Sequence, residues 1–99
     1  MVKHIVLFKL KESLSTEKRW EVMTAFKKAI EALPARIDFI KHIEVGLNAN
    51  PAEQWDIALN SDFETMDEVR AYAAHPDHVA AASILGPYKD SRACVDYEY

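Results

Sequence analysis

The sequence has little of several residue types: one cysteine, two glycines and four prolines in 99 residues. The single cysteine, Cys94, excludes a disulfide within the chain and is typical of a reducing compartment, so we expect a cytoplasmic protein. We interpret Cys94 as a small apolar residue in a strand rather than as a nucleophile. No apolar run approaches the roughly 20 residues of a membrane span. The apolar start is interrupted at Lys9 and is too short for a signal peptide, so no membrane partner is expected.

The chain also lacks an excess of basic residues, with a net charge of −4. This charge disfavours nucleic acid as a partner, because such proteins carry a basic stripe. There is no glycine-rich phosphate loop, which excludes a nucleotide site of that kind, and no nucleophile elbow, which excludes a serine hydrolase of that kind. Apolar residues make up 49% and charged residues 28%, a balance typical of one globular domain over 1–99.

Apolar periodicity predicts four strands and three helices. Alternating or β-branched runs favour strands, and apolar residues repeated every three or four positions favour helices. The expected elements are a strand over 2–10, a helix from Ser15 to Pro34, strands over 37–47 and 55–63, helices over 65–74 and 76–85, and a strand over 93–99.

Capping signals and an apolar stripe support these helices. Ser15 is a suitable N-cap for the first helix, and Thr65 with Glu68 fits a capping box at the start of the second. Gly86 and the proline after it are typical of a helix C-terminus. The expected core-facing stripe of the first helix is Trp20, Met23, Phe26, Ile30 and Leu33.

The element order is βαββαβ, which predicts an α+β fold. Two β-α-β halves in this order are the signature of the ferredoxin-like plait, in which helices cover one face of a four-stranded antiparallel sheet.

The first strand is apolar on both faces at its centre, where Ile5 and Leu7 oppose Val6 and Phe8. The helices of this plait cover only one face of the sheet, and a bare apolar face usually marks an interface. We therefore expect a homodimer, packed through the helix-free faces of two sheets into a dimeric α/β barrel.

The segment over 72–78 places a phenol and two imidazoles, Tyr72, His75 and His78, around Pro76. Because proline breaks a helix and then starts the next one well, the junction can aim polar side chains inward. His4 lies on the same face of the first strand as Val6, so it can reach the same space if that face meets the helices.

Five stretches of the sequence together resemble the stress-responsive α/β-barrel (Dabb) domain family, over essentially all 99 residues. They are HIVLFK at 4–9, EVG at 44–46, ALNSDF at 58–63, the Tyr-to-His-Pro-Asp-His segment at 72–78 and VDY at 95–97. The resemblance implies a dimeric ferredoxin-like barrel. Ala35 stands where the family often has glycine, which affects only a turn.

One plant branch of that family consists of polyketide cyclases, which close a ring by an intramolecular aldol reaction without a metal or organic cofactor. The resemblance implies a pocket between sheet and helices, lined by residues that match His4, Tyr72 and His78 of this chain. The chain departs from the cyclases on its first helix, where Phe26 occupies the expected position of a further pocket tyrosine.

An aldol closure needs a base and a donor to the enolate oxygen. We assign the base to His78, since imidazole titrates near neutral pH, and the donor to Tyr72, with His4 in the same pocket. His75 is expected to have a structural role at the helix end. A small-molecule ligand without turnover, a structural or protective stress-response role, and a cofactor-free oxygenase on a similar barrel remain alternatives.

A metal site is not expected, and no cofactor is predicted. His75 and His78 lie on either side of a proline break, and no carboxylate or cysteine falls at a spacing that completes a zinc set.

Overall fold

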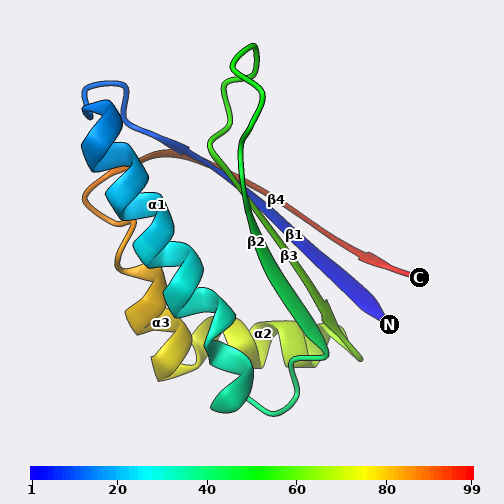
Figure 1. The fold of residues 1–99 in the computed structure, drawn as a ribbon. Coiled ribbons are helices and arrows are strands. Elements are labelled where there is room, and N and C mark those ends of the chain that lie inside the picture. Colours follow the sequence, from blue (N-terminus) through cyan, green and yellow to red (C-terminus); the bar gives the residue numbers. More distant parts are fainter.

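Three α-helices lie on one face of a four-stranded antiparallel sheet in the computed structural model, which describes residues 1–99 (Figure 1). The strand order β2-β3-β1-β4 and the βαββαβ succession confirm the predicted ferredoxin-like α+β fold. No helix combines the length and the apolar character that crossing a membrane requires. The elements in chain order are β1 (Val2–Leu10), α1 (Thr16–Glu31), the 3-10 turn η1 (Leu33–Ala35), β2 (His42–Leu47), β3 (Ile57–Phe63), α2 (Met66–Ala74), α3 (Pro76–Ala82) and β4 (Lys89–Glu98).

Strand β1 lies in the middle of the sheet and separates two different environments. Its even-numbered residues are buried beneath the helices, whereas its odd-numbered residues are half-buried on the other face. His4 therefore points to the helix side, as expected from its place beside Val6. Ile5 and Leu7 face away from the helices, where Val95 and Ala93 of β4 are their cross-strand partners.

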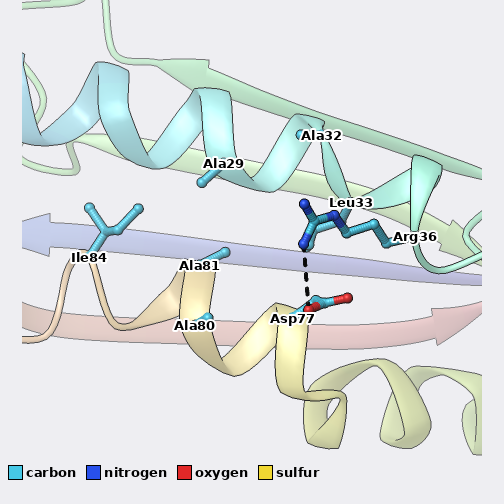
Figure 2. A pocket seen from close by; sticks show the side chains of 8 residues that line it. All are labelled: Ala29, Ala32, Leu33, Arg36, Asp77, Ala80, Ala81 and Ile84. Atoms are coloured by element: carbon cyan, nitrogen blue, oxygen red, sulfur yellow. Dashed lines mark ion pairs between the residues drawn. The ribbon is translucent and has the colours of Figure 1, made fainter.

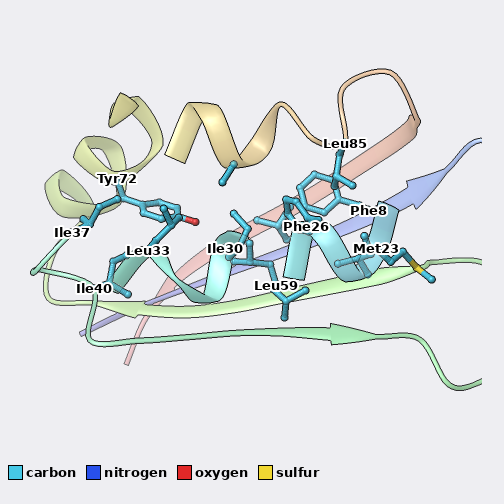
Figure 3. Packing of buried hydrophobic residues seen from close by; sticks show 14 of the residues in the cluster. Phe8, Met23, Phe26, Ile30, Leu33, Ile37, Ile40, Leu59, Tyr72 and Leu85 are labelled. Atoms are coloured by element: carbon cyan, nitrogen blue, oxygen red, sulfur yellow. The ribbon is translucent and has the colours of Figure 1, made fainter. Parts of the chain in front are cut away.

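Helix α1 packs its apolar stripe on the sheet, but Trp20 is not part of that stripe. Trp20 is 58% exposed, which contradicts its expected place in the core. At 3.6 residues per turn it lies roughly 100° around the helix from the centre of the buried stripe. The stripe consists of Val22, Met23, Phe26 and Ile30, continued by Leu33 of η1 (Figure 3).

Three strand boundaries differ from the prediction. Ile37 and Ile40 are buried, but they lie in turns before β2, because their N–H groups donate to Leu33 and Ile37 carbonyls instead of a neighbouring strand. Strand β3 begins at Ile57 rather than 55. Strand β4 begins at Lys89 rather than 93, and its pairing with β1 shifts between Lys9 and Leu10.

The helix junction expected around Pro76 is present. His75 ends α2 and also caps α3, since its Nδ1 accepts a hydrogen bond from the Asp77 N–H at 3.1 Å. At the other end of α2, the Thr65 hydroxyl accepts from the Glu68 N–H at 3.2 Å. The capping box is only half formed, because Glu68 Oε2 is buried without a hydrogen-bond partner.

Candidate functional site

A cavity of about 130 Å³ lies between the helices and the sheet. That volume is close to the roughly 150 Å³ apolar cavity known to accommodate benzene in other proteins, so it suits a single ring or a short chain. Its walls come from β1, α1, β3, α2, α3 and β4. The lining residues are His4, Val6, Phe8, Phe26, Leu59, Tyr72, Ala73, His78, Ala82, Leu85, Lys89 and Arg92.

Tyr72 reaches this cavity from the buried face of α2, which it shares with Val69 one turn earlier. The side chain is 1% exposed, and its hydroxyl has no hydrogen-bond partner. In Figure 3 the hydroxyl points from α2 along the core toward Phe26. A buried hydroxyl without a partner costs about 1–3 kcal/mol of stability, so a ligand oxygen at this point would be stabilised.

His78 is held by the helix junction. Its Nδ1 lies 3.0 Å from the carbonyl oxygen of Ala73, in the last turn of α2. A carbonyl can only accept, so Nδ1 carries the hydrogen and the neutral ring keeps Nε2 as its free acceptor. Burial lowers the pKa of His78 below its ordinary value of 6.5, although the Ala73 hydrogen bond opposes this effect. The charges of His4, Arg92 and His75 lower the pKa further.

His4 enters the cavity from β1 and is oriented by the neighbouring strand. Asp96 of β4 is its cross-strand partner, and the Asp96 carboxylate accepts a hydrogen bond from His4 Nδ1. This contact engages Nδ1 and leaves Nε2 as the other polar atom of the ring. His4 is 7% exposed.

The structure brings the three predicted residues together. The ring centroids of Tyr72 and His78 are 4.3 Å apart, and those of His4 and Tyr72 are 6.1 Å apart. Tyr72 is thus close to both imidazoles, and Phe26 lines the same cavity at the position noted in the sequence. His75 lies at the helix end and is not among the lining residues.

Burial keeps Tyr72 as a hydrogen-bond donor. It raises the pKa of Tyr72 well above the ordinary value of 10, because the phenolate is poorly solvated in an apolar enclosure. A neutral phenol and a neutral imidazole therefore stand side by side at pH 7. The phenol can donate a hydrogen bond to one atom of a ligand, and the imidazole can accept a proton from another.

One group of side chains could hold a metal ion, and its members were not expected to meet. Ligand atoms of His4, Cys94 and Asp96 all lie within 4.8 Å of one another. However, Asp96 already accepts from His4 Nδ1, and burial and the Asp96 charge raise the pKa of the Cys94 thiol. Metals bind the thiolate, so this arrangement suits a hydrogen-bonded cluster better than a zinc site. Cys94 is exposed.

Three residues around the cavity escaped the sequence analysis: Asp96, Lys89 and Arg92. Each belongs to β4, and each becomes visible only once the register between β1 and β4 is known. Alternation places Asp96 on the side of Cys94, but nothing in the sequence shows that it lies opposite His4. The two cations precede the part of β4 that was predicted as a strand.

A second and larger cavity, of about 340 Å³, lies between α1 and α3 (Figure 2). Apolar residues make up most of its wall, and the ion pair of Arg36 and Asp77, 3.8 Å apart, lies at one end. None of its polar groups is buried without a partner. The smaller cavity has convergent polar groups with displaced pKa values, which are the usual marks of a functional site.

Comparison with known proteins shows relatives that cover nearly the whole chain. A stress-response A/B barrel domain-containing protein of Arabidopsis thaliana is 33% identical over 98% of this chain, which spans 36% of that protein. Olivetolic acid cyclase of Cannabis sativa is 22% identical over 97% of this chain and 94% of its own.

A crystal structure from Bacteroides fragilis, described as a dimeric protein of unknown function with a ferredoxin-like fold, is 60% identical. It has a TM-score of 0.98 and covers 99% of this chain and 95% of its own. The family pattern of the Stress responsive A/B Barrel Domain, Dabb, matches residues 2–99. The chain therefore belongs to the stress-responsive A/B barrel, or Dabb, family.

Proposed function

We propose that this protein binds a small carbonyl compound in the His4–Tyr72–His78 cavity and catalyses an aldol-type ring closure without a cofactor. The observation that carries the proposal is the pairing of Tyr72 with His78. An unpartnered buried hydroxyl and an imidazole with a free Nε2 lie with ring centroids 4.3 Å apart. Such a pair can polarise a carbonyl and remove a proton from the neighbouring carbon.

The first step is proton abstraction. His78 Nε2 takes a proton from the carbon next to a carbonyl, and the electron pair of that C–H bond moves onto the carbonyl oxygen. The Tyr72 hydroxyl donates a hydrogen bond to the enolate oxygen that forms. Preorganised donors of this kind stabilise charge as it develops, and they are most effective where water is excluded.

Carbon–carbon bond formation follows within the same molecule. The enolate carbon attacks a second carbonyl, and the alkoxide produced takes the proton back from the His78 imidazolium. The catalytic histidine returns to its neutral form, so no external oxidant or reductant is needed. His4, oriented by Asp96, offers a second ring nitrogen to a hydroxyl or enol of the folded substrate.

The relationship to olivetolic acid cyclase supports this chemistry, since that relative is named as a cyclase and aligns over 97% of this chain. The single free thiol, Cys94, agrees with a cytoplasmic location.

A homodimer is part of the proposal. The helix-free face carries Ile5, Leu7, Val95 and Tyr97, of which Val95 is 53% exposed in the isolated chain. A contiguous apolar surface of this kind favours pairing with a second copy. The dimeric relative from Bacteroides fragilis, at 60% identity, supports the same assembly.

A panel of linear β-polyketo acids tests the function, with ring-closed product followed by mass spectrometry and binding followed by thermal shift. Product that disappears in His78→Ala and Tyr72→Phe supports catalysis. Binding without product in the wild-type protein would replace the enzyme with a carrier or sensor. Neither binding nor product would leave the cavity with a structural role.

A further inference from the structure

Two cations line the cavity. The rest of its wall consists of two histidines, one tyrosine and apolar residues. Lys89 and Arg92 both belong to β4, and both are exposed at the cavity mouth. Neither forms an ion pair in the structure. The other three arginines each lie within 4.0 Å of a carboxylate, in the pairs Arg19–Asp56, Arg36–Asp77 and Arg70–Asp67.

The register of the sheet explains why these cations face the cavity. Arg92 lies opposite Phe8 of β1, whose ring forms part of the wall. Lys89 lies opposite Leu10, beyond the register shift at Lys9 and Leu10. This irregularity turns Lys89 to the same rim as Arg92, although the two residues are three apart in sequence and would alternate in a regular strand.

The acidic groups nearby do not neutralise this rim. Asp90 accepts a hydrogen bond from the Ser91 hydroxyl at 2.8 Å. The Asp96 carboxylate accepts a hydrogen bond from His4 Nδ1. The chain as a whole carries a net charge of −4, so an unpaired basic rim around one opening is a local feature. Several charges of one sign at the mouth of a low-dielectric cleft raise the local concentration of ions of the opposite sign.

We propose that the cavity selects organic anions, with a ring-sized apolar body inside and a carboxylate or phosphate held at the rim by Arg92 and Lys89. The inference rests on the proposed function in one respect, namely that the cavity binds a small molecule. The cavity volume of about 130 Å³ is enough for a ring-sized apolar body. Arg92 suits bidentate capture of a planar anion, and Lys89 adds a point charge.

The position of the anion follows from the electrostatics of the site. Arg92 and His78 line the same cavity, and the charge of Arg92 lowers the pKa of His78. An anion on Arg92 would therefore lie at the mouth of the cavity that the base lines. The ligand is thus expected to carry its carbonyl inward and its charge outward.

Three probes of similar ring size test the inference: benzoate, phenyl phosphate and the neutral benzamide. Binding to the wild-type protein is measured by calorimetry and by NMR shifts of the His78 ring. We expect at least one anion to bind about tenfold or more tightly than benzamide, as a charge-assisted contact allows, with the difference shrinking at high salt. The two anions separate a carboxylate ligand from a phosphate ester.

The variants Arg92→Gln and Lys89→Gln are expected to remove this preference by weakening binding of the anions far more than binding of benzamide. Lys28→Gln is the matched control, since Lys28 is an exposed lysine of α1 without an ion-pair partner and does not line the cavity. Tyr72→Phe is expected to leave the preference for anions in place, because its buried hydroxyl is not part of the cationic rim.

The outcomes separate the two proposals. Benzamide binding as tightly as both anions, or a preference that survives loss of both cations, would overturn the anion site and leave the proposed cavity function intact. Absence of binding by every probe, with no shift of the His78 resonances, would overturn both.

Discussion

The Nδ1–H of His78 donates to the carbonyl oxygen of Ala73, 3.0 Å away across the junction of α2 and α3. The junction therefore determines which ring nitrogen carries the hydrogen. A residue of α2 that would otherwise have a free carbonyl at the helix end sets the tautomer of a residue in α3. The local structure created by Pro76 thus has a direct chemical effect at the cavity.

Replacing His78 by alanine tests its role as the base. We expect His78→Ala to reduce turnover of a β-polyketo acid by about 10²-fold or more, the range typical of general base catalysis, while the protein remains folded. His42→Ala is the control, because His42 is exposed on β2 and does not line the cavity. Equal losses in the two variants would contradict the assignment.

The reaction rate is expected to rise with pH as His78 loses its proton. Because burial lowers the pKa of His78, the ring is neutral above pH 6.5, and activity should fall as the pH drops below that value. No alkaline loss from Tyr72 is expected near pH 9, since burial raises the pKa of that phenol. NMR titration of the histidine ring protons, compared with the rate profile, checks both limits.

The same titration affects stability. The unfolded chain binds a proton on His78 at a higher pH than the folded chain does, so the free energy of unfolding should decrease as the pH falls from about 6.5 toward the folded-state pKa. Urea titrations at several pH values measure this change. In His78→Gln this part of the pH dependence of the free energy of unfolding should be absent. An unchanged pH dependence in that variant would contradict the role of His78.

Loss of the helix cap tests the start of α2. Thr65→Ala should lower the free energy of unfolding by about 1 kcal/mol, a typical N-cap contribution, because the Glu68 N–H loses its acceptor. Glu68→Gln should not reproduce this loss, since the Glu68 carboxylate does not complete the box. Denaturant titration compares the two variants.

The helix-free face is tested by introducing a charge. Leu7→Glu is expected to dissociate the homodimer or unfold the chain, since burying an unpaired carboxylate is costly. Light scattering distinguishes the dimer from the 11.3 kDa chain. Val79→Glu is the control, because Val79 is 55% exposed on α3, away from that face. A wild-type protein that stays at 11.3 kDa at micromolar concentration would contradict the dimer.

Local rules were sufficient for much of the fold. The caps at Ser15 and Thr65, the break at Pro76 and the orientation of His4 all follow from neighbouring residues, and the structure contains each of them. Apolar alternation misled the strand prediction between Ile37 and Lys41, because an apolar residue can enter a core from a turn as well as from a strand.

The site could be predicted only in part. His4, Tyr72 and His78 carry recognisable chemistry, and the predicted elements bring them together. Asp96 and Arg92 depend on the register between β1 and β4, which joins the two ends of the chain and includes an irregularity at Lys9 and Leu10. No periodicity within one strand contains that information.

Strand β4 uses alternate residues for two separate surfaces. Arg92 and Asp96 pair with the even-numbered side of β1, toward the cavity, whereas Val95 and Tyr97 belong to the helix-free face. Anything that covers the second surface also restrains the backbone that carries the first. If two copies pair through that surface, any effect of ligand on the dimerisation constant must be matched by an equal effect of dimerisation on ligand affinity.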